Sequence, residues 1–211
     1  MTDKILSILK DRFTVKELES TRLKANGMTF DVKSYKAEGL GHVSVMRAKG
    51  FFGLMKMDTL IVNPIEIDLP LYSYDRIFAA GNDTLIVELY DTVLGSFNGE
   101  TLKNVKTDFS DLEERDPGEH WYDDIKLKES ISKKGKKSQS QLFDELTLRH
   151  FEAYLSAEAD VITDVDKKQE KASVYVEGLL KNGGPSTDVF KKSVGEEKTA
   201  NLFRNILFGT K

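Results

Sequence analysis

The sequence of 211 residues contains no cysteine. This absence excludes disulfide bonds, zinc sites built on thiolates, cysteine nucleophiles and an iron–sulfur cluster held by the chain's own thiolates. No apolar run approaches the ~20 residues that a membrane-spanning helix needs, and the N-terminal segment is too short and too charged for a signal peptide. We therefore expect a cytoplasmic protein with no membrane partner.

An excess of one charge is also missing. The chain has 31 basic and 35 acidic residues, which leaves a net charge of −4. Such a balance offers no electrostatic case for nucleic-acid binding. The basic run at 126–137 is a local exception, and it is interpreted either as a solvated loop or as a docking surface for an acidic protein.

The common catalytic motifs are absent. The sequence has no glycine-rich dinucleotide motif after a strand, no Walker A motif, no HExxH and no nucleophile elbow. The three histidines, His42, His120 and His150, are far apart and show no metal-binding spacing, so each is interpreted as a surface or structural residue.

The pattern of apolar residues predicts a helix, then a sheet, an irregular segment and three more helices. Short links between the strands favour an antiparallel sheet, and the order of elements indicates one α+β domain over residues 1–211, with helices covering the sheet. Segment 98–140 is hard to interpret, and its part 126–141 is predicted to be a solvated loop. The predicted helices are 2–20, 140–158, 164–181 (ended by "NGGP" at 182–185) and 186–207, and the predicted strands are 28–37, 41–50, 53–64, 74–81 and 84–91.

One acidic residue lies at an unexpected place. Asp75 ends the stretch "LPLYSYD" (69–75) and comes directly before the apolar hairpin "RIFAAGNDTLIVELYD" (76–91). An aspartate at a strand start commonly caps a turn or pairs with an arginine such as Arg47 or Arg76. The other interpretation is a buried acid, whose pKa would be raised by its apolar neighbours.

"LPLYSYD" resembles the sheet motif of the ferredoxin-dependent bilin reductases, Leu-Pro-Leu-aromatic-Gly-Cys-Asp, in which Asp75 falls on the family's acid. The preceding segment "MDTLIVNPIEIDLP" (57–70) and the following hairpin align as well. Weaker likenesses extend the resemblance over about residues 28–209. They are "HWYDDI" (120–125) with the family's tryptophan segment, "LKNG" (180–183) with its Asn-Asp pair, and "GEEKTANLFRNILFGT" (195–210) with its closing helix.

The resemblance implies a three-layer α/β/α sandwich with a central antiparallel sheet. It also implies an enzyme that reduces a linear tetrapyrrole held between the sheet and the C-terminal helices. Single electrons would come from ferredoxin or a similar acidic electron-transfer protein, with no metal or flavin bound by the chain itself. Asp75 would donate protons. The implied site comprises Asp75 and Asp58 as catalytic residues, and Ser44, Tyr72, Tyr74, Trp121 and Asn182 as substrate-binding residues.

The sequence departs from the family at three positions. Asp58 and Ser44 align with the family's two sheet histidines, and Gly183, beside the retained Asn182, aligns with its helix aspartate. If Asp58 and Asp75 face one pocket, they can share a proton and raise each other's pKa. The losses also leave open a non-catalytic protein that binds a tetrapyrrole or another planar ligand. A third interpretation is an interaction domain whose pocket is filled with side chains.

Overall fold

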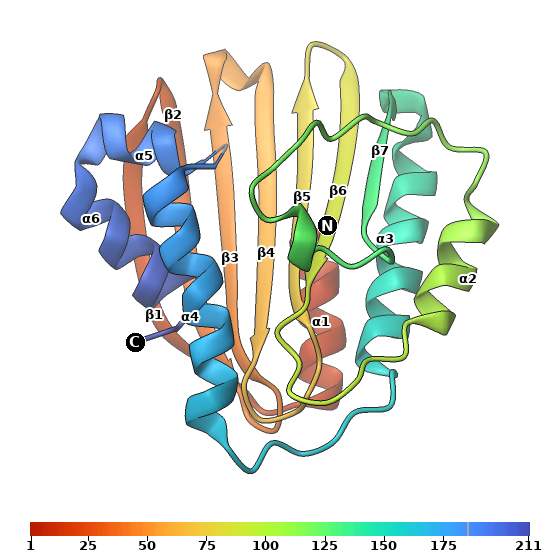
Figure 1. Cartoon of the computed structure of the whole chain (residues 1–211). Coiled ribbons are helices and arrows are strands. Elements are labelled where there is room, and N and C mark those ends of the chain that lie inside the picture. Colours follow the sequence, from red (N-terminus) through yellow and green to blue (C-terminus); the bar gives the residue numbers. More distant parts are fainter. Residues whose placement is uncertain (185) are drawn as a thin grey trace.

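Seven antiparallel strands form the middle layer of the protein, and they lie side by side in their order along the chain (Figure 1). The computed structural model describes residues 1–184 and 186–211. The strands are β1 (Val15–Ala25), β2 (Met28–Ala37), β3 (Gly41–Gly50), β4 (Met55–Pro64), β5 (Leu71–Ala79), β6 (Asn82–Tyr90) and β7 (Ile131–Lys136).

Helices cover both faces of this sheet. One face packs against α1 (Thr2–Arg12), α2 (Glu100–Asp108) and α3 (Ser140–Leu155). The other packs against α4 (Val165–Asn182), α5 (Thr187–Val194), α6 (Glu196–Asn201) and a π-helical segment, Leu202–Leu207. The predicted α+β fold, a three-layer sandwich with a central antiparallel sheet, is confirmed. No helix in the described part of the chain is long and apolar enough to cross a membrane.

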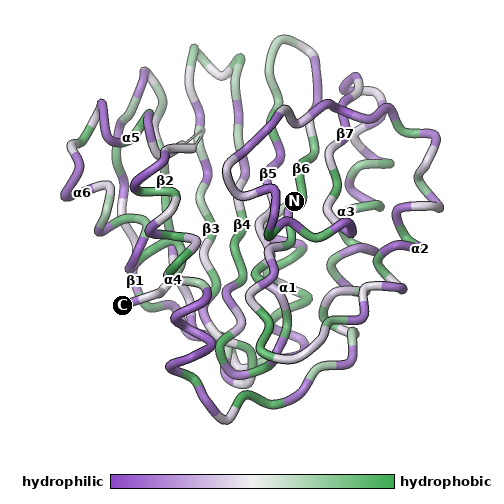
Figure 2. The backbone as a smooth tube through the Cα atoms, viewed as in Figure 1, coloured by the Kyte–Doolittle hydropathy of each residue, from purple (hydrophilic) through white to green (hydrophobic). Residues whose placement is uncertain are grey.

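Two hydrophobic cores result from the alternation of side chains along each strand. On β4, Leu60 belongs to the core under α1 and α3, whereas Ile61 belongs to the core under α4. Figure 2 shows hydrophobic residues concentrated in the central strands, while the long loop between α2 and β7 is mainly hydrophilic. The residues of any one strand are therefore divided by parity between two different environments.

The first predicted helix, 2–20, is too long. The helix ends at Arg12, and residues from Val15 onward pair with β2 as an edge strand. Most side chains of β1 are exposed, so they lack the strict alternation of a half-buried strand. The backbone pairing with β2 therefore determines the structure of this segment, and its hydrophobic pattern gives little sign of it.

The segment 126–141 is also not a solvated loop throughout, because it contains β7. Lys133 is only 2% exposed, and its Nζ donates a hydrogen bond to the Leu112 carbonyl at 2.8 Å and pairs with Glu114 at 2.7 Å. A lysine can pack its aliphatic chain in a core when its ammonium reaches polar partners.

The predicted helix 186–207 is interrupted. Gly195, at φ +87°, separates α5 from α6, a left-handed conformation that glycine adopts without strain. The predicted stop of the preceding helix is found at Asn182, where Gly183 at φ +84° follows α4. Pro185, the last residue of that predicted stop, lies outside the described residues.

Candidate active site

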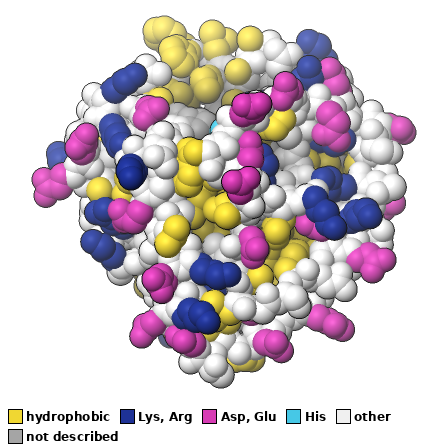
Figure 3. All heavy atoms as spheres, in the orientation of Figure 1, with side chains coloured by type: hydrophobic (Ala, Val, Ile, Leu, Met, Phe, Trp, Pro, Cys, Tyr) yellow, Lys and Arg dark blue, Asp and Glu magenta, His cyan; other side chains and the backbone are white. Residues whose placement is uncertain are grey.

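A cavity of about 170 Å³ lies between the sheet and the C-terminal helices. In Figure 3 a hollow opens on the front face, below a hydrophobic patch at the top of the molecule. Its floor is made by alternate residues of three central strands, and its walls and roof come from α4, the loop after α2 and the C-terminal segment. The floor includes Met57, Thr59, Ile61, Ser73, Asp75, Ile77, Ile86, Glu88 and Tyr90.

The floor has a distinctive burial pattern. Along β5, the residues that face α3, such as Tyr72 and Tyr74, are fully buried, whereas Ser73, Asp75 and Ile77 are partly accessible. The accessible surface of these three faces the cavity, because they line it. Side chains therefore do not fill this space, which is contrary to the interpretation of the chain as an interaction domain with a filled pocket.

Asp75 lies at the centre of the floor, in β5, between Thr59 of β4 and Ile86 of β6. Burial raises the pKa of Asp75 to about 6, because the surrounding protein disfavours the charged carboxylate. A hydrogen bond from the Thr59 hydroxyl to Asp75 Oδ1 opposes this effect, and the negative charge of Glu88 adds to it. Asp75 is thus a carboxylic acid that can hold or release a proton near neutral pH.

Glu88 is a second carboxylate on the same floor. It lies in β6 opposite Ser73, and its Oε2 accepts a hydrogen bond of 2.6 Å from the Tyr90 hydroxyl. Lys126 Nζ lies 4.0 Å from its other oxygen. Glu88 thus has a hydroxyl donor and a lysine nearby, whereas Asp75 has no cation beside it in the described structure. Two carboxylates on adjacent strands therefore have different environments.

Three tyrosines form the wall next to these carboxylates. The Tyr90 and Tyr175 rings lie 4.2 Å apart at 31°, and the Tyr122 ring meets Tyr90 edge-on at 5.5 Å. Burial raises the pKa of all three hydroxyl groups, so they stay protonated and can donate hydrogen bonds at neutral pH. The wall suits a flat, conjugated ligand with polar atoms at its edge.

The rim of the cavity carries Arg115 and His120. Arg115 is partly buried and forms no ion pair within the described residues. Its only side-chain hydrogen bond there is a long one, 3.4 Å, to the Ser132 hydroxyl. His120 stacks on Tyr122 at 4.9 Å, and its Nδ1 lies 3.8 Å from Asp123 Oδ1. No cluster of histidine and carboxylate side chains in the described structure could hold a metal ion.

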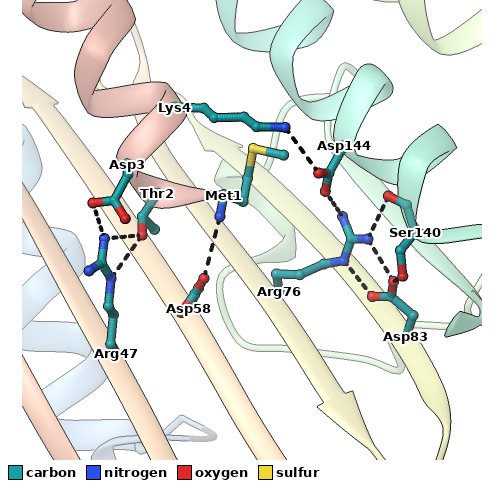
Figure 4. Close-up of polar contacts among 10 residues, drawn as sticks. All are labelled: Met1, Thr2, Asp3, Lys4, Arg47, Asp58, Arg76, Asp83, Ser140 and Asp144. Atoms are coloured by element: carbon teal, nitrogen blue, oxygen red, sulfur yellow. Dashed lines mark hydrogen bonds and ion pairs between the residues drawn. The ribbon is translucent and has the colours of Figure 1, made fainter.

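Asp58 is not part of this cavity, so the condition for a proton shared between Asp58 and Asp75 is not met. Asp58 pairs with Arg76 in the register and so faces α1, on the opposite side of the sheet. Its carboxylate lies 3.7 Å from the amino group of Met1 (Figure 4). Thr59, one residue later, occupies the position beside Asp75.

Tyr72 and Tyr74 also lie on the α1–α3 face, because they differ in parity from Asp75. Tyr72 packs against Phe151 and Tyr154 of α3, with ring centres 5.2 and 4.7 Å away. Both tyrosines are completely buried, so neither contacts the cavity. They are core residues rather than substrate-binding residues.

The other three predicted substrate-binding residues lie around the site rather than in it. Ser44 is on the cavity face of β3, but its hydroxyl donates to the Leu207 carbonyl at 2.7 Å and thereby anchors the C-terminal segment. Trp121 lies behind the tyrosine wall and donates from Nε1 to the Gly183 carbonyl at 3.0 Å. Asn182 ends α4 and is exposed.

Sequence reasoning missed most of the cavity residues. Glu88 and Tyr90 lie opposite residues of β5 that are an even number of positions from Asp75. The pairing of β5 with β6 would therefore have placed them on the floor. Arg115, His120 and Tyr122 come from an irregular loop, in which no periodic signal exists.

Comparison with known proteins finds a match in three-dimensional structure and none in sequence. No protein-family model matches the sequence, and no curated protein is similar enough in sequence to match it. Among solved structures, phytochromobilin synthase from tomato, crystallised in complex with biliverdin, superposes with a TM-score of 0.77. The match covers 99% of this chain and 82% of that chain at 12% sequence identity. This chain has the fold of that enzyme. The resemblance found in the sequence is confirmed at the level of the fold.

Proposed function

We propose that the protein is a divergent member of the ferredoxin-dependent bilin reductases, and that it reduces a linear tetrapyrrole in the cavity above Asp75. The observation that carries the proposal is an acid with a raised pKa on the cavity floor, between sheet and C-terminal helices. The fold adds support, since it is that of an enzyme crystallised with biliverdin.

The reduction of one double bond takes up two electrons and two protons. In the proposed reaction ferredoxin supplies the electrons one at a time, and Asp75 supplies the protons. After each donation, a proton taken up from solvent at the cavity mouth restores the carboxylic acid. Apolar and aromatic walls keep bulk water away from the radical formed after the first electron.

The pKa of Asp75 suits this role. With a pKa of about 6, roughly one molecule in ten carries the proton at pH 7. A flat apolar ligand that displaces water from the cavity raises this pKa further, because the carboxylate loses its remaining hydration. Binding of the substrate therefore loads the proton donor, and general acid catalysis is most efficient when the donor pKa lies near the working pH.

The remaining cavity residues fit the recognition of such a substrate. The tyrosine wall provides a flat surface for a conjugated system, and the hydroxyls of Tyr122 and Tyr175 can donate to its polar edge, since that of Tyr90 already donates to Glu88. Arg115 on the rim is placed to bind a carboxylate substituent. The propionate groups of a bilin are such substituents. The cavity is smaller than the roughly 300–1,000 Å³ of drug-sized pockets, so we expect the loop around Arg115 to move outward on binding.

The test is to mix the protein anaerobically with biliverdin, reduced ferredoxin and a ferredoxin reductase, and to follow the visible spectrum. We expect product bands with the native protein and with Asp58→Asn, whose side chain lies on the opposite face. Asp75→Asn should slow product formation by about 100-fold or more. Product formation by Asp75→Asn at the native rate would refute the role of Asp75.

One observation favours a second candidate, a tetrapyrrole-binding protein without catalysis. The hydroxyl hydrogen-bonded to Asp75 belongs to Thr59, a side chain that does not titrate near neutral pH and cannot replace a histidine relay. In the same experiment such a protein would shift the spectrum of biliverdin on mixing and show no later change after reduced ferredoxin is added. The absence of any shift would refute both functions.

A further inference from the structure

The turn between β3 and β4 exposes an apolar tip, formed by Phe51, Phe52 and Leu54. These side chains are 50%, 108% and 74% exposed, so Phe52 is accessible on all sides. The turn lies at the top of the sheet in Figure 1, and Figure 3 shows a hydrophobic patch in that place, directly above the hollow. No other residues in the described structure cover this tip.

The backbone holds the two aromatic rings in this exposed position. Phe51 and Phe52 have φ values of +50° and +56°, and Gly53 follows at +87°. A left-handed conformation is costly for bulky residues, and here it persists because the pairing of β3 with β4 closes the turn. The turn thus contains two residues in a strained backbone conformation, and their apolar side chains point into solvent.

A row of lysines lies across the sheet just below the tip. The register places Lys24 beside Thr29, Thr29 beside Lys49, and Lys49 beside Lys56, so the three lysines share one level of the sheet. All three are exposed, and none forms an ion pair within residues 1–184 and 186–211.

The charged side chains two residues further down contrast with this row, because each has a partner. Figure 4 shows several of these contacts. The pairs are Arg22 with Asp31, Arg47 with Asp3, Asp58 with the Met1 amino group, and Arg76 with Asp83. On this part of the sheet, the three lysines next to the tip are thus the basic residues that have no acidic partner among the described residues.

We propose that this tip, together with the three lysines below it, docks the protein on an anionic lipid surface. The phenylalanine and leucine side chains enter the region between headgroups and acyl chains, while the lysines attract the anionic headgroups. A protein partner is the less suitable occupant, because protein interfaces place their aromatic anchors in pockets of a broad matching surface. The exposed apolar side chains belong to one short turn with lysines below it, and a fluid bilayer can receive both. We expected no membrane partner because no apolar run is long enough to span a bilayer. A tip that enters only the boundary between headgroups and acyl chains needs no such run.

Docking would place the cavity at the lipid surface. From the tip, β4 leads directly to Met57, which lines the cavity floor. An apolar, conjugated compound that partitions into the bilayer would then reach the cavity without crossing bulk water. The docking itself does not depend on the proposed reduction, because it involves no residue of the cavity.

The test is flotation of the full chain with vesicles of phosphatidylcholine alone or mixed with phosphatidylserine, in the absence of any bilin. We expect binding to the mixed vesicles that weakens as ionic strength rises. Phe52→Ser should reduce binding by about tenfold or more, and the triple variant Lys24→Gln, Lys49→Gln, Lys56→Gln by a similar factor. The matched controls are Val174→Ser, 67% exposed on α4, and Lys10→Gln with Lys103→Gln and Lys167→Gln, and they should bind as the native chain does.

A Phe52→Trp variant, built on Trp121→Phe, gives a second measurement. Its emission should shift to shorter wavelength on vesicle binding and be quenched by lipids brominated in the acyl chain. Equal binding to neutral and anionic vesicles, or binding that the tip variants leave unchanged, would refute the proposal. A tip variant that alters only self-association, or only binding to reduced ferredoxin, would instead assign the tip to a protein interface and refute it as well.

Discussion

The buried carboxyl group of Asp75 lowers the stability of the folded protein at neutral pH. The pKa of a free aspartate is near 3.8, whereas burial raises that of Asp75 to about 6. The folded state therefore keeps the proton at a pH where the unfolded chain has released it. The sign follows from this difference: the group favours folding below pH 4, and this contribution is lost as the pH rises through 6.

This linkage predicts that Asp75→Asn stabilises the protein at neutral pH. The shift of about two pKa units corresponds to about 1–3 kcal/mol, with allowance for the contact of Asp75 with the cavity. Urea unfolding at pH 7 should give a larger free energy of unfolding for the variant, and the difference should vanish below pH 4. A destabilised variant at pH 7 would show that the carboxylate is not held in an unfavourable environment.

At the residue scale, the success of a prediction depended on which face of the sheet each strand residue points to. Asp75 was placed on the cavity floor, as expected for a buried acid. Tyr72, Tyr74 and Asp58 were assigned to the same site by alignment and by proximity along the chain, yet each differs from Asp75 in the face to which its strand position points. A displacement of one residue along a strand moves a side chain through the full thickness of the sheet.

At the scale of single elements, α4 depends on one buried lysine. Lys168 Nζ donates to Asp68 Oδ1 at 3.0 Å and to the carbonyls of Leu69 and Thr92 at 2.7 and 2.9 Å. Burial alone would raise the pKa of Asp68, but the amides of Leu94 and Gly95 together with Lys168 lower it. This cluster joins the roof of the cavity to the loop before β5 and to the loop after β6.

We therefore expect Lys168→Met to lower the free energy of unfolding by about 3–5 kcal/mol, because Asp68 would remain buried without its cation. Urea unfolding at pH 7 measures this change. The neighbouring Lys167 is exposed, so Lys167→Met should change stability by no more than about 0.5 kcal/mol. Equal effects of the two substitutions would mean that the buried pair does not hold α4.

The elements that the sequence did not predict are those that tertiary contacts create. β1 has mainly exposed side chains and is a strand because β2 offers it backbone partners. β7 is rich in lysine, and Lys133 can be buried there because its ammonium group has partners in the loop after α2. The strands from β2 to β6 and the helices α3 and α4 carry their own periodicity, and these were predicted within a few residues.

At the scale of the whole molecule, the cavity joins segments from distant parts of the chain. The floor comes from residues 57–90, one wall from 115–122, and the roof from 175–208. Trp121, the only tryptophan, contacts the rings of Tyr122 and Tyr175 and is hydrogen-bonded to Gly183 at the end of α4. It therefore lies where two of the three segments meet.

Trp121 should report ligand binding. Biliverdin absorbs in the near ultraviolet, where tryptophan emits, so we expect its binding in the cavity to quench the emission of Trp121. Fluorescence titration of the native chain and of Asp75→Asn should give similar affinities, while Trp121→Phe should abolish the signal. Unchanged emission at concentrations that alter the visible spectrum of biliverdin would place the ligand elsewhere.

The simple order of the strands has a consequence for synthesis of the protein on the ribosome. Every strand from β1 to β6 pairs with its neighbour in sequence, so the floor of the cavity is built from local hairpins of the kind that form fast. The roof begins at Tyr175, which is translated 100 residues after Asp75. Until they dock, Asp75 faces water and is an ordinary aspartate. Its pKa therefore rises late, when the C-terminal helices close over the sheet.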